Sequence, residues 1–400
     1  MGTILLISNW FDVLGGTEVL SKAVRVALAE RGHNVIHLAC DRRLQKPCVK
    51  ELSSKITKIM VPLPRLENSS NYWTRAAIYN FVESFLQRRK IKVDAAHFFH
   101  FSNIGLEITS KLKLKNVVIT FTDYSLICPD FQYFVRHEKR ICHQRTTKQC
   151  PKCTGRSSFI LERERSENLH RVCSNNWKIS YQTPYQRRIF ESFGVPYNSC
   201  ISELGKYPPS DGRALLIKNH QAQRRKKIRF AFFGRATVEK GLDTIVSASS
   251  LLQGDPKIEL HAYLLDPENS KFNTTRPAIN GNLFFHKAVS YTEVVSVMSQ
   301  YDYLLLPSIW LENYPIVSSQ AQEAGLGIVA SNLPSLRDLP DFKFAHWVQP
   351  GNPQSWAQTI RTLRTAQRSG KRPNQMLRRA KQRQEFIEYV ENFEKFYFNS

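Results

Sequence analysis

The stretch that decides the fold is YLLLPSIWLENYPIVSSQAQEAG, residues 303–325. Its first four residues, Tyr303–Leu306, form an apolar run with the length of a buried strand. Ser318–Ala324 follows as a helix that a glycine closes. Glu312 falls in the loop between them, where folding does not require a carboxylate. A carboxylate there can accept hydrogen bonds from two sugar hydroxyls, although an ordinary solvated loop glutamate is the competing interpretation.

Strands and helices alternate on both sides of this stretch, in two series. The predicted strands are Ile4–Ser8, Asn34–Ala39, Ala95–His100, Val117–Phe121, Trp177–Tyr181, Arg229–Gly234, Ile258–Leu264, Leu283–Phe285, Tyr303–Leu306 and Gly327–Ala330. The predicted helices are Thr17–Arg31, Tyr72–Lys90, Thr183–Phe193, Gly241–Leu252, Tyr291–Gln300, Ser318–Ala324, Pro353–Gln367 and Gln375–Phe398. Such alternation is typical of parallel sheets covered by helices.

Two series in 400 residues predict two doubly wound α/β domains. We expect the first domain at residues 1–205, a basic linker at 206–227, the second domain at 228–372 and a C-terminal helix at 373–400. Periodicity fails at residues 123–166, which predicts an irregular, cysteine-rich insertion. Ligands of doubly wound sheets bind at the carboxyl ends of the strands, so the site is expected in the cleft between the domains.

The charge of the chain predicts an anionic partner. The formal net charge is +23, from 57 Lys and Arg against 34 Asp and Glu. The basic residues gather in three runs, Arg88–Lys92, Arg224–Arg229 and Arg361–Arg383. Such an excess attracts an anionic membrane surface or a phosphorylated substrate. Nucleic acid is not expected, because no recognition motif accompanies the charge.

The sequence also predicts the compartment. No apolar run approaches the roughly 20 residues of a membrane-spanning helix, and Met1–Ser8 has no basic leader. We therefore expect a cytoplasmic protein, peripheral at the inner face of the membrane. In the helix Tyr72–Lys90, apolar residues lie beside Arg88 and Arg89. That apolar face can meet a bilayer or pack on the first domain's sheet, and the sequence leaves both alternatives open.

Two turns between a strand and a helix have the residues of an anion site. In FGRATVEKG, residues 233–241, Arg235 and Lys240 are expected beside a helix N-terminus, which suits a diphosphate. A surface loop with solvated charges is the alternative. Gly15 and Gly16 open the first predicted helix, where glycine lets a ligand approach the backbone. Their spacing is not that of GxGxxG, which disfavours a nicotinamide enzyme.

In combination, these motifs resemble glycosyltransferase family 4, from Ile4 to about Val390. The resemblance implies the GT-B fold, in which two Rossmann-like domains face a cleft and a C-terminal helix crosses back to the first domain. It also implies a hexosyltransferase-like enzyme that retains anomeric configuration, uses a UDP or GDP sugar and needs no catalytic metal or other cofactor. We expect the acceptor to be a glycan or a lipid-linked glycan.

The resemblance also assigns the site residues. Arg235 and Lys240 would hold the donor diphosphate, and Glu312 would hold the donor sugar. The other residues implied to lie near the donor are Gly15, Gly16, Gly234, Asn313, Tyr314, Pro315, Ile316 and Gln320.

Three departures from the family's pattern favour an alternative. Gln320 stands where the family usually has a second glutamate, and Thr122 stands where a histidine often precedes Asp123. The glycine-rich turn expected after residues 258–260 is replaced by HAYLLD, residues 261–266. The alternative function is a catalytically weakened or inactive GT-B protein that binds a nucleotide sugar or a glycan.

Four cysteines, Cys128, Cys142, Cys150 and Cys153, fall within the predicted insertion. The Cys-Pro-Lys-Cys-Thr-Gly piece resembles a zinc knuckle, whose tight turn aims two thiolates at one metal. The four predict a structural zinc site, with nearby histidines as substitutes. Free thiols, a disulfide or redox chemistry are the alternatives.

Two histidines, His97 and His100, lie near a strand end that should face the cleft. A packed histidine with satisfied hydrogen bonds is the expected case, and an acceptor-side role stays open for one of them.

Overall fold

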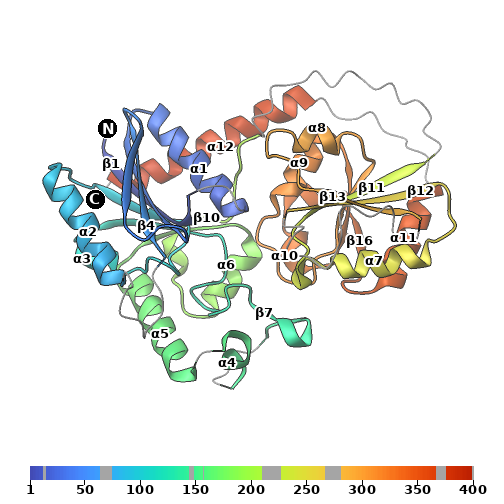
Figure 1. Ribbon diagram of the computed structural model, residues 1–400, viewed down its shortest axis with the longest axis horizontal. Helices are drawn as coiled ribbons and strands as arrows, with labels where there is room; N and C mark the ends of the chain where they lie inside the picture. Colours follow the sequence, from blue (N-terminus) through green and yellow to red (C-terminus); the bar gives the residue numbers. More distant parts are fainter. Residues whose placement is uncertain are drawn as a thin grey trace. The chain divides into compact units, whose positions relative to one another are not determined.

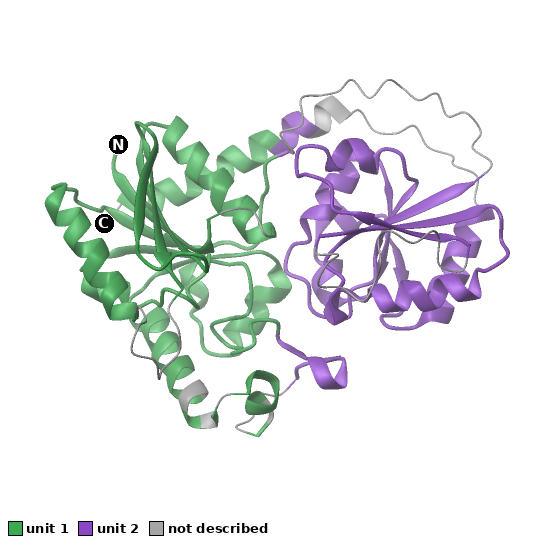
Figure 2. Ribbon diagram, viewed as in Figure 1, with its two compact units in different colours: residues 1–132, 145–208, 383–400 green, residues 133–144, 209–382 purple. Residues whose placement is uncertain are grey.

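The computed structural model describes most of the chain, in two compact units (Figures 1 and 2). Unit 1 comprises residues 1–132, 145–208 and 383–400, and unit 2 comprises residues 133–144 and 209–382. Each unit has helices packed on a largely parallel sheet, which confirms the predicted α/β class. The described residues are 1–11, 15–63, 74–143, 148–155, 157–209, 227–265, 281–365 and 375–398.

Unit 1 is built on an eight-stranded sheet in the order β10-β9-β6-β5-β1-β2-β4-β3. Its strands are β1 Thr3–Trp10, β2 Asn34–Asp41, β3 Cys48–Ser53, β4 Ile56–Pro62, β5 Ala95–Phe98, β6 Asn116–Phe121, β9 Lys178–Tyr181 and β10 Cys200–Ser202. Its helices are α1 Gly16–Glu30, α2 Arg75–Arg88, α3 Ile108–Lys111, α4 Gln149–Thr154, α5 Ser158–Ser174, α6 Pro184–Glu191 and the short η2 Tyr197–Ser199. All neighbouring strands are parallel except the edge pair β3 and β4.

Unit 2 is built on a six-stranded, wholly parallel sheet in the order β13-β12-β11-β14-β15-β16. Its strands are β11 Ile228–Gly234, β12 Ile258–Leu264, β13 Leu283–Lys287, β14 Tyr303–Leu306, β15 Gly327–Ser331 and β16 His346–Val348. Its helices are η3 Val238–Lys240, α7 Leu242–Leu251, α8 Val294–Met298, α9 Ile316–Ala324, α10 Pro334–Arg337, η5 Pro340–Phe342 and α11 Pro353–Thr365. The unit also contains the small hairpin β7 Phe134–Val135 and β8 Arg140–Ile141, joined by η1 Arg136–Glu138.

Both sheets have a switch point, by which we mean the place where the order of strands along the sheet reverses. In unit 1 the chain runs from β1 outward through β2 and β4, then returns to the other side of β1 for β5, β6, β9 and β10. In unit 2 the reversal falls between β11 and β14. Ligands of doubly wound sheets bind outside the carboxyl ends of the strands at such points. The topology therefore marks one ligand position in each unit.

Apolar strands explain why these sheets form. In β12 the alternate residues Ile258, Leu260, Ala262 and Leu264 are buried, as expected for a strand with one fully covered face. They pack with Trp356 of α11 in one core cluster. The opposite face packs against α8 and α9 in a second cluster. Burial on both faces is typical of parallel sheets.

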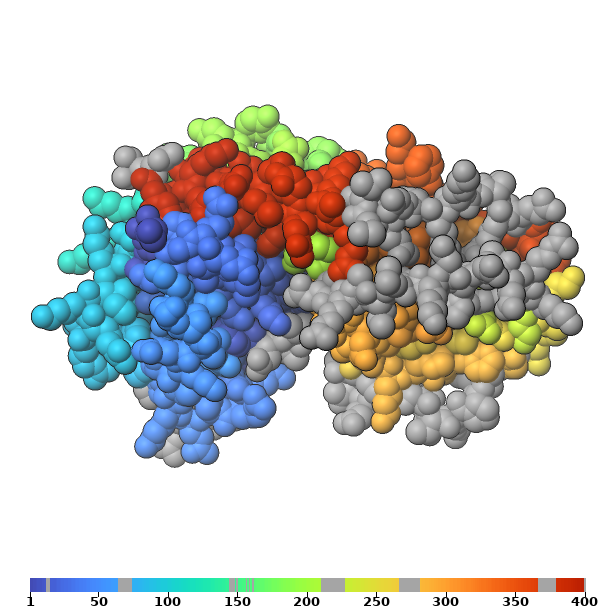
Figure 3. All heavy atoms as spheres, turned by 90° about the horizontal axis from the view of Figure 1, so that it is seen from above, coloured from blue at the N-terminus to red at the C-terminus, as the bar shows by residue number. Residues whose placement is uncertain are grey.

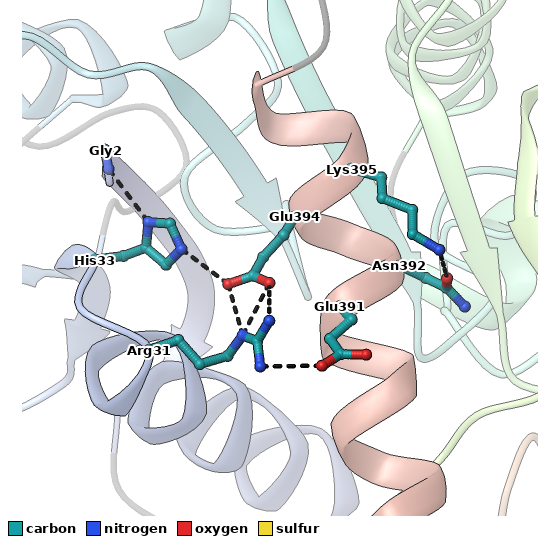
Figure 4. Close-up of polar contacts among 7 residues, drawn as sticks. All are labelled: Gly2, Arg31, His33, Glu391, Asn392, Glu394 and Lys395. Atoms are coloured by element: carbon teal, nitrogen blue, oxygen red, sulfur yellow. Dashed lines mark hydrogen bonds and ion pairs between the residues drawn. The ribbon is translucent and has the colours of Figure 1, made fainter.

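The C-terminal helix α12 spans Gln375–Phe398, as the sequence predicts. Its residues from Arg383 onward belong to unit 1, which confirms that the helix returns to the first domain. In Figure 3 it lies along the N-terminal residues. Figure 4 shows the polar contacts: Nε of Arg31 lies 2.8 Å from both carboxylate oxygens of Glu394, and Nε2 of His33 lies 2.8 Å from one of them. Phe393 and Tyr397 of the same helix are fully buried.

His97 is a packed histidine, the expected case in the sequence. Its Nδ1 lies 2.6 Å from the hydroxyl of Tyr397, and its Nε2 lies 2.7 Å from Oγ1 of Thr120. Burial lowers its pKa to about 3, so the ring is neutral. His97 therefore holds α12 on the sheet and is closed to an acceptor.

The structure corrects one sequence-based expectation, adds one hairpin and decides between two open alternatives. Residues 123–166 are not wholly irregular, because α4 and the start of α5 lie within them. The hairpin of β3 and β4 was not predicted, since every residue of β3 is exposed and its sequence lacks a buried face. The helix predicted at 72–90 is α2, and its apolar residues Ile78, Phe85 and Leu86 are buried. That face packs in unit 1, the second of the two alternatives, and is not presented to a bilayer.

No helix in the described ranges is long and apolar enough to cross a bilayer.

Candidate functional site

The expected donor site lies at the switch point of unit 2. Arg235 and Lys240 follow the carboxyl end of β11. Ser308 and Glu312 follow the carboxyl end of β14, the neighbouring strand. The topology thus gathers side chains more than 60 residues apart in the sequence at one edge of the sheet, where a ligand is expected.

Lys240 and Glu312 are bonded directly. Nζ of Lys240 lies 2.7 Å and 3.0 Å from the two carboxylate oxygens of Glu312. Oγ of Ser308 donates to Oε1 of Glu312 at 2.5 Å. Because Glu312 is only 3% exposed, its charge depends on these partners, since an unpaired buried carboxylate is costly. The Lys240 ammonium also lies 5.1 Å from the centre of the Trp310 ring, within range of a cation–π interaction.

Gly241 makes this arrangement possible. Its φ of +69° lies in the left-handed region, and a Cβ at this position would collide with the carbonyl oxygen of Pro307. The backbone amide of Ile309 donates to the carbonyl oxygen of Glu239 at 2.9 Å. The turn after β11 therefore packs directly against the loop after β14. This packing places Lys240 beside Glu312.

Arg235 is not brought into this pair. It is exposed, one residue beyond Gly234, which ends β11. No ion pair of Arg235 is found among the residues that the structure describes. The guanidinium is open to an incoming anion, which fits the diphosphate role that the sequence predicts for it.

The loop from Asn313 to Ile316 leads into the N-terminus of α9. Asn313 is buried, Pro315 is the N-cap residue and Ile316 is the first helical residue. The hydroxyl of Tyr314 donates to Oδ2 of Asp341 at 2.7 Å, so this side chain anchors the loop to η5. The loop backbone is thereby held beside Glu312, the position predicted for donor contacts.

Gln320 and Glu323 share one buried face of α9. In the described part of the chain, the Gln320 amide has no hydrogen-bond partner within the protein, which leaves it able to bond a ligand hydroxyl. Glu323 forms an ion pair with Nε of Arg379 on α12, at 3.0 Å. Glu323 was not among the residues predicted from the sequence, although its spacing of three residues from Gln320 was a usable signal.

Ser308 and Trp310 were also missed as site residues. Both lie within the quoted motif, and the hydroxyl four residues before Glu312 was the available signal. Nε1 of Trp310 is buried and has no hydrogen-bond partner among the described residues. Its N–H group can therefore serve a ligand bound at Glu312.

Gly15 and Gly16 belong to unit 1, at the N-terminus of α1. Gly15 is the N-cap residue and Gly16 the first residue of the helix. Thr122 follows β6, and its hydroxyl donates to the carbonyl oxygen of Phe99 at 2.9 Å. Thr122 therefore serves the backbone. The neighbouring Asp123 is contacted at 3.3 Å by His100, which follows β5.

The predicted zinc ligands do not form a recognisable site. Cys128 and Cys142 are buried, and Cys150 and Cys153 are half-buried on α4. Across the described ranges, which omit residues 144–147, no group of three or more His, Cys, Asp or Glu could hold a metal ion. The arrangement gives no support to the zinc site, and we derive no role for a metal.

One family model matches the chain. Residues 216–383, which fall in unit 2 apart from the last residue, match the model described as glycosyl transferases group 1. No curated protein matches the sequence.

Solved GT-B glycosyltransferases are similar to the chain over its whole length. A glycosyltransferase from Rickettsia africae has a TM-score of 0.66 at 16% identity, covering 100% of this chain and 99% of its own. HepE from Anabaena in complex with UDP-glucose has a TM-score of 0.63 at 11% identity, covering 98% of each chain. Sucrose-phosphate synthase from Thermosynechococcus elongatus has a TM-score of 0.60 at 18% identity, covering 99% and 96%. At these identities the likeness establishes the GT-B fold, as predicted.

Proposed function

We propose that the protein is a retaining glycosyltransferase with a nucleotide-diphosphate sugar as its donor, because residues 216–383 match the glycosyl transferases group 1 model and the chain has the GT-B fold. The acceptor is a glycan or a lipid-linked glycan. The observation that carries the proposal is the Lys240–Glu312 pair at the switch point of unit 2. The UDP-glucose complex of HepE supports a UDP sugar as the first donor to test.

The pair suits a site that exchanges partners when the donor binds. Without donor, the Lys240 ammonium neutralises Glu312. A donor diphosphate offers Lys240 a second anion, and Arg235 is exposed to meet the same group. Glu312 then accepts hydrogen bonds from hydroxyls of the donor sugar. As the bond between sugar and diphosphate breaks, negative charge develops on the diphosphate and positive charge on the sugar. Lys240 and Arg235 stabilise the first, and Glu312 stabilises the second.

Retention follows from attack on the face from which the diphosphate departs. The oxygen of the acceptor hydroxyl attacks the anomeric carbon. Its proton passes to an oxygen of the departing diphosphate. The site then needs cations and hydrogen-bond acceptors around the donor, and the described unit 2 residues supply both. No metal or cofactor is required by this scheme.

A nucleotide-release assay tests the function. The full chain is incubated with a panel of UDP and GDP sugars, with and without crude membrane lipid. We expect release of nucleotide from one donor, increased by the lipid fraction. Tight binding of a nucleotide without turnover on any acceptor fraction would favour the alternative, a non-catalytic binding protein on the same fold.

Gln320 offers a test of the donor pocket. If its amide contacts the ribose, Gln320→Glu should leave the affinity for the cognate nucleotide diphosphate unchanged or raise it, because a charged acceptor bonds a hydroxyl more strongly. Isothermal titration calorimetry measures this affinity. Complete loss of binding would show that the pocket is built around the amide and that the ribose assignment is wrong.

The membrane role is proposed from charge alone. The proposal is a cytoplasmic protein held peripherally at the inner membrane face. We expect the full chain to sediment with anionic liposomes at low salt and to be released at high salt. Because the apolar face of α2 is buried, the double change Arg88→Glu with Arg89→Glu should weaken sedimentation only slightly. Lys113→Glu with Lys115→Glu is the matched control, since it reverses two exposed charges elsewhere in unit 1. Sedimentation that survives high salt would contradict a purely electrostatic attachment.

A further inference from the structure

Unit 1 has its own cluster of polar side chains at its switch point. Strands β6, β5 and β1 are neighbours, and their carboxyl ends meet at one edge of the sheet. His100 follows β5 and Asp123 follows β6. Glu18 lies in the first turn of α1, the helix that follows β1. Three elements thus bring three titratable groups to the position where a doubly wound sheet binds its ligand.

His100 lies between the two carboxylates. Its Nε2 is 3.3 Å from Oδ2 of Asp123, and its Nδ1 is 4.0 Å from Oε1 of Glu18. Burial alone would lower the pKa of His100, but the hydrogen bond and charge of Asp123, together with the charge of Glu18, outweigh it and raise the pKa. Asp123 in turn has a lowered pKa, because His100 and Ser125 offset its burial. Both shifts favour the charged forms, a protonated ring beside an ionised Asp123.

One atom of this cluster lacks a partner. Nδ1 of His100 is buried and makes no hydrogen bond within the described part of the protein. The 4.0 Å to Glu18 is too long for one. A buried polar atom without a partner costs free energy, so such an atom in a native fold calls for an explanation. A ligand hydroxyl would supply the missing partner.

The charge of the cluster restricts what that ligand can be. With two carboxylates and one imidazole, the cluster has no net positive charge whether or not the ring is protonated, which disfavours a phosphate or carboxylate ligand. The surroundings add neutral groups: Nδ2 of Asn9, near the end of β1, donates to Oγ of Ser102 at 2.9 Å. Donors and acceptors without net positive charge suit hydroxyl groups.

We propose that Glu18, His100 and Asp123 form a subsite of unit 1 that binds a hydroxyl group of an uncharged saccharide. A hydroxyl oxygen placed roughly 2.8 Å from both Nδ1 of His100 and Oε1 of Glu18 would bridge the present gap, accepting from the ring and donating to the carboxylate. The ideal Cβ position of Gly15 lies 3.5 Å from Oε2 of Glu18, so the backbone of this turn comes close to the carboxylate. Asp123 fixes the ring and its proton. The inference rests on the proposed function only in naming a saccharide as the ligand.

Saturation-transfer NMR on the full chain tests the subsite. The probes are the methyl glycosides of glucose, galactose, mannose and N-acetylglucosamine, with glucose 6-phosphate as the charged comparison. We expect a neutral glycoside to bind the wild type and the charged sugar to bind less. His100→Gln and Glu18→Gln should each weaken glycoside binding about tenfold, the worth of one hydrogen bond to a charged group.

A matched histidine supplies the control. Like His100, His33 pairs with a carboxylate: its partner is Glu394 of α12, at 2.8 Å. This pair lies away from the switch point. His33→Gln should therefore bind the glycoside as the wild type does. Calorimetry with UDP separates the two proposals, because failure to bind UDP counts against the donor site in unit 2 and leaves the glycoside result standing.

Three outcomes would overturn the subsite. These are no binding of any neutral glycoside to the wild type, preferential binding of the phosphorylated sugar, and wild-type glycoside affinity in both His100→Gln and Glu18→Gln. If His100→Gln does not fold, the Glu18→Gln variant alone decides, since it removes a charge without changing side-chain size.

Discussion

Replacing Glu312 with Gln is expected to lower the rate of sugar transfer roughly a hundredfold, on the order of 3 kcal/mol for a charge-assisted contact used in the transition state. The substitution keeps the size of the side chain but removes its charge. It also turns an amide N–H toward the Lys240 ammonium or the Ser308 hydroxyl, both of which donate to Glu312 in the native site. Steady-state transfer with the true donor and acceptor measures the effect.

Glu259 provides the matched control for this change. It pairs with Lys227 at 2.9 Å and with Arg229 at 2.8 Å, near the amino end of β12 and so at the opposite edge of the same sheet. Glu259→Gln should leave the transfer rate close to that of the wild type. Full activity in Glu312→Gln, or an equal loss in the two variants, would show that Glu312 does not hold the donor.

Replacing Lys240 with Met is expected to destabilise the protein by about 3–5 kcal/mol, the usual cost of leaving one member of a buried ion pair alone. Glu312, at 3% exposure, would keep only the Ser308 hydroxyl of the partners described above. Urea unfolding followed by fluorescence measures the loss as a shift of the midpoint. Adding Glu312→Gln to this variant should recover much of the stability, because the uncompensated charge is then removed.

Lys227→Met tests whether burial of the ion pair is the reason for the loss of stability expected in Lys240→Met. Lys227 and Glu259 form a pair of nearly the same length, but the Lys227 side chain is 49% exposed, against 22% for Lys240. An exposed pair contributes at most about 1 kcal/mol. Equal destabilisation by Lys227→Met and Lys240→Met would mean that the Lys240–Glu312 pair is no more than a surface contact.

The sequence by itself determined the fold class and the edge of the sheet where Arg235, Lys240 and Glu312 lie. Apolar runs such as Tyr303–Leu306 fixed the strands, because a strand buried on both faces must be apolar throughout. Gln375–Phe398 was predicted with its observed bounds, since a long helix has a continuous pattern. The exposed strand β3 was missed for the opposite reason: it has no buried face to give a pattern.

Only the tertiary structure decided which of these residues meet. Lys240 and Glu312 are 72 residues apart, and they touch because β11 and β14 are neighbours in the sheet and a glycine lets their loops approach. His97 and His100 are three residues apart on one strand and its extension, yet α12 buries the first and the switch point receives the second. Periodicity reports the face of a single element, whereas contact between elements depends on the order of the strands, which local sequence does not encode.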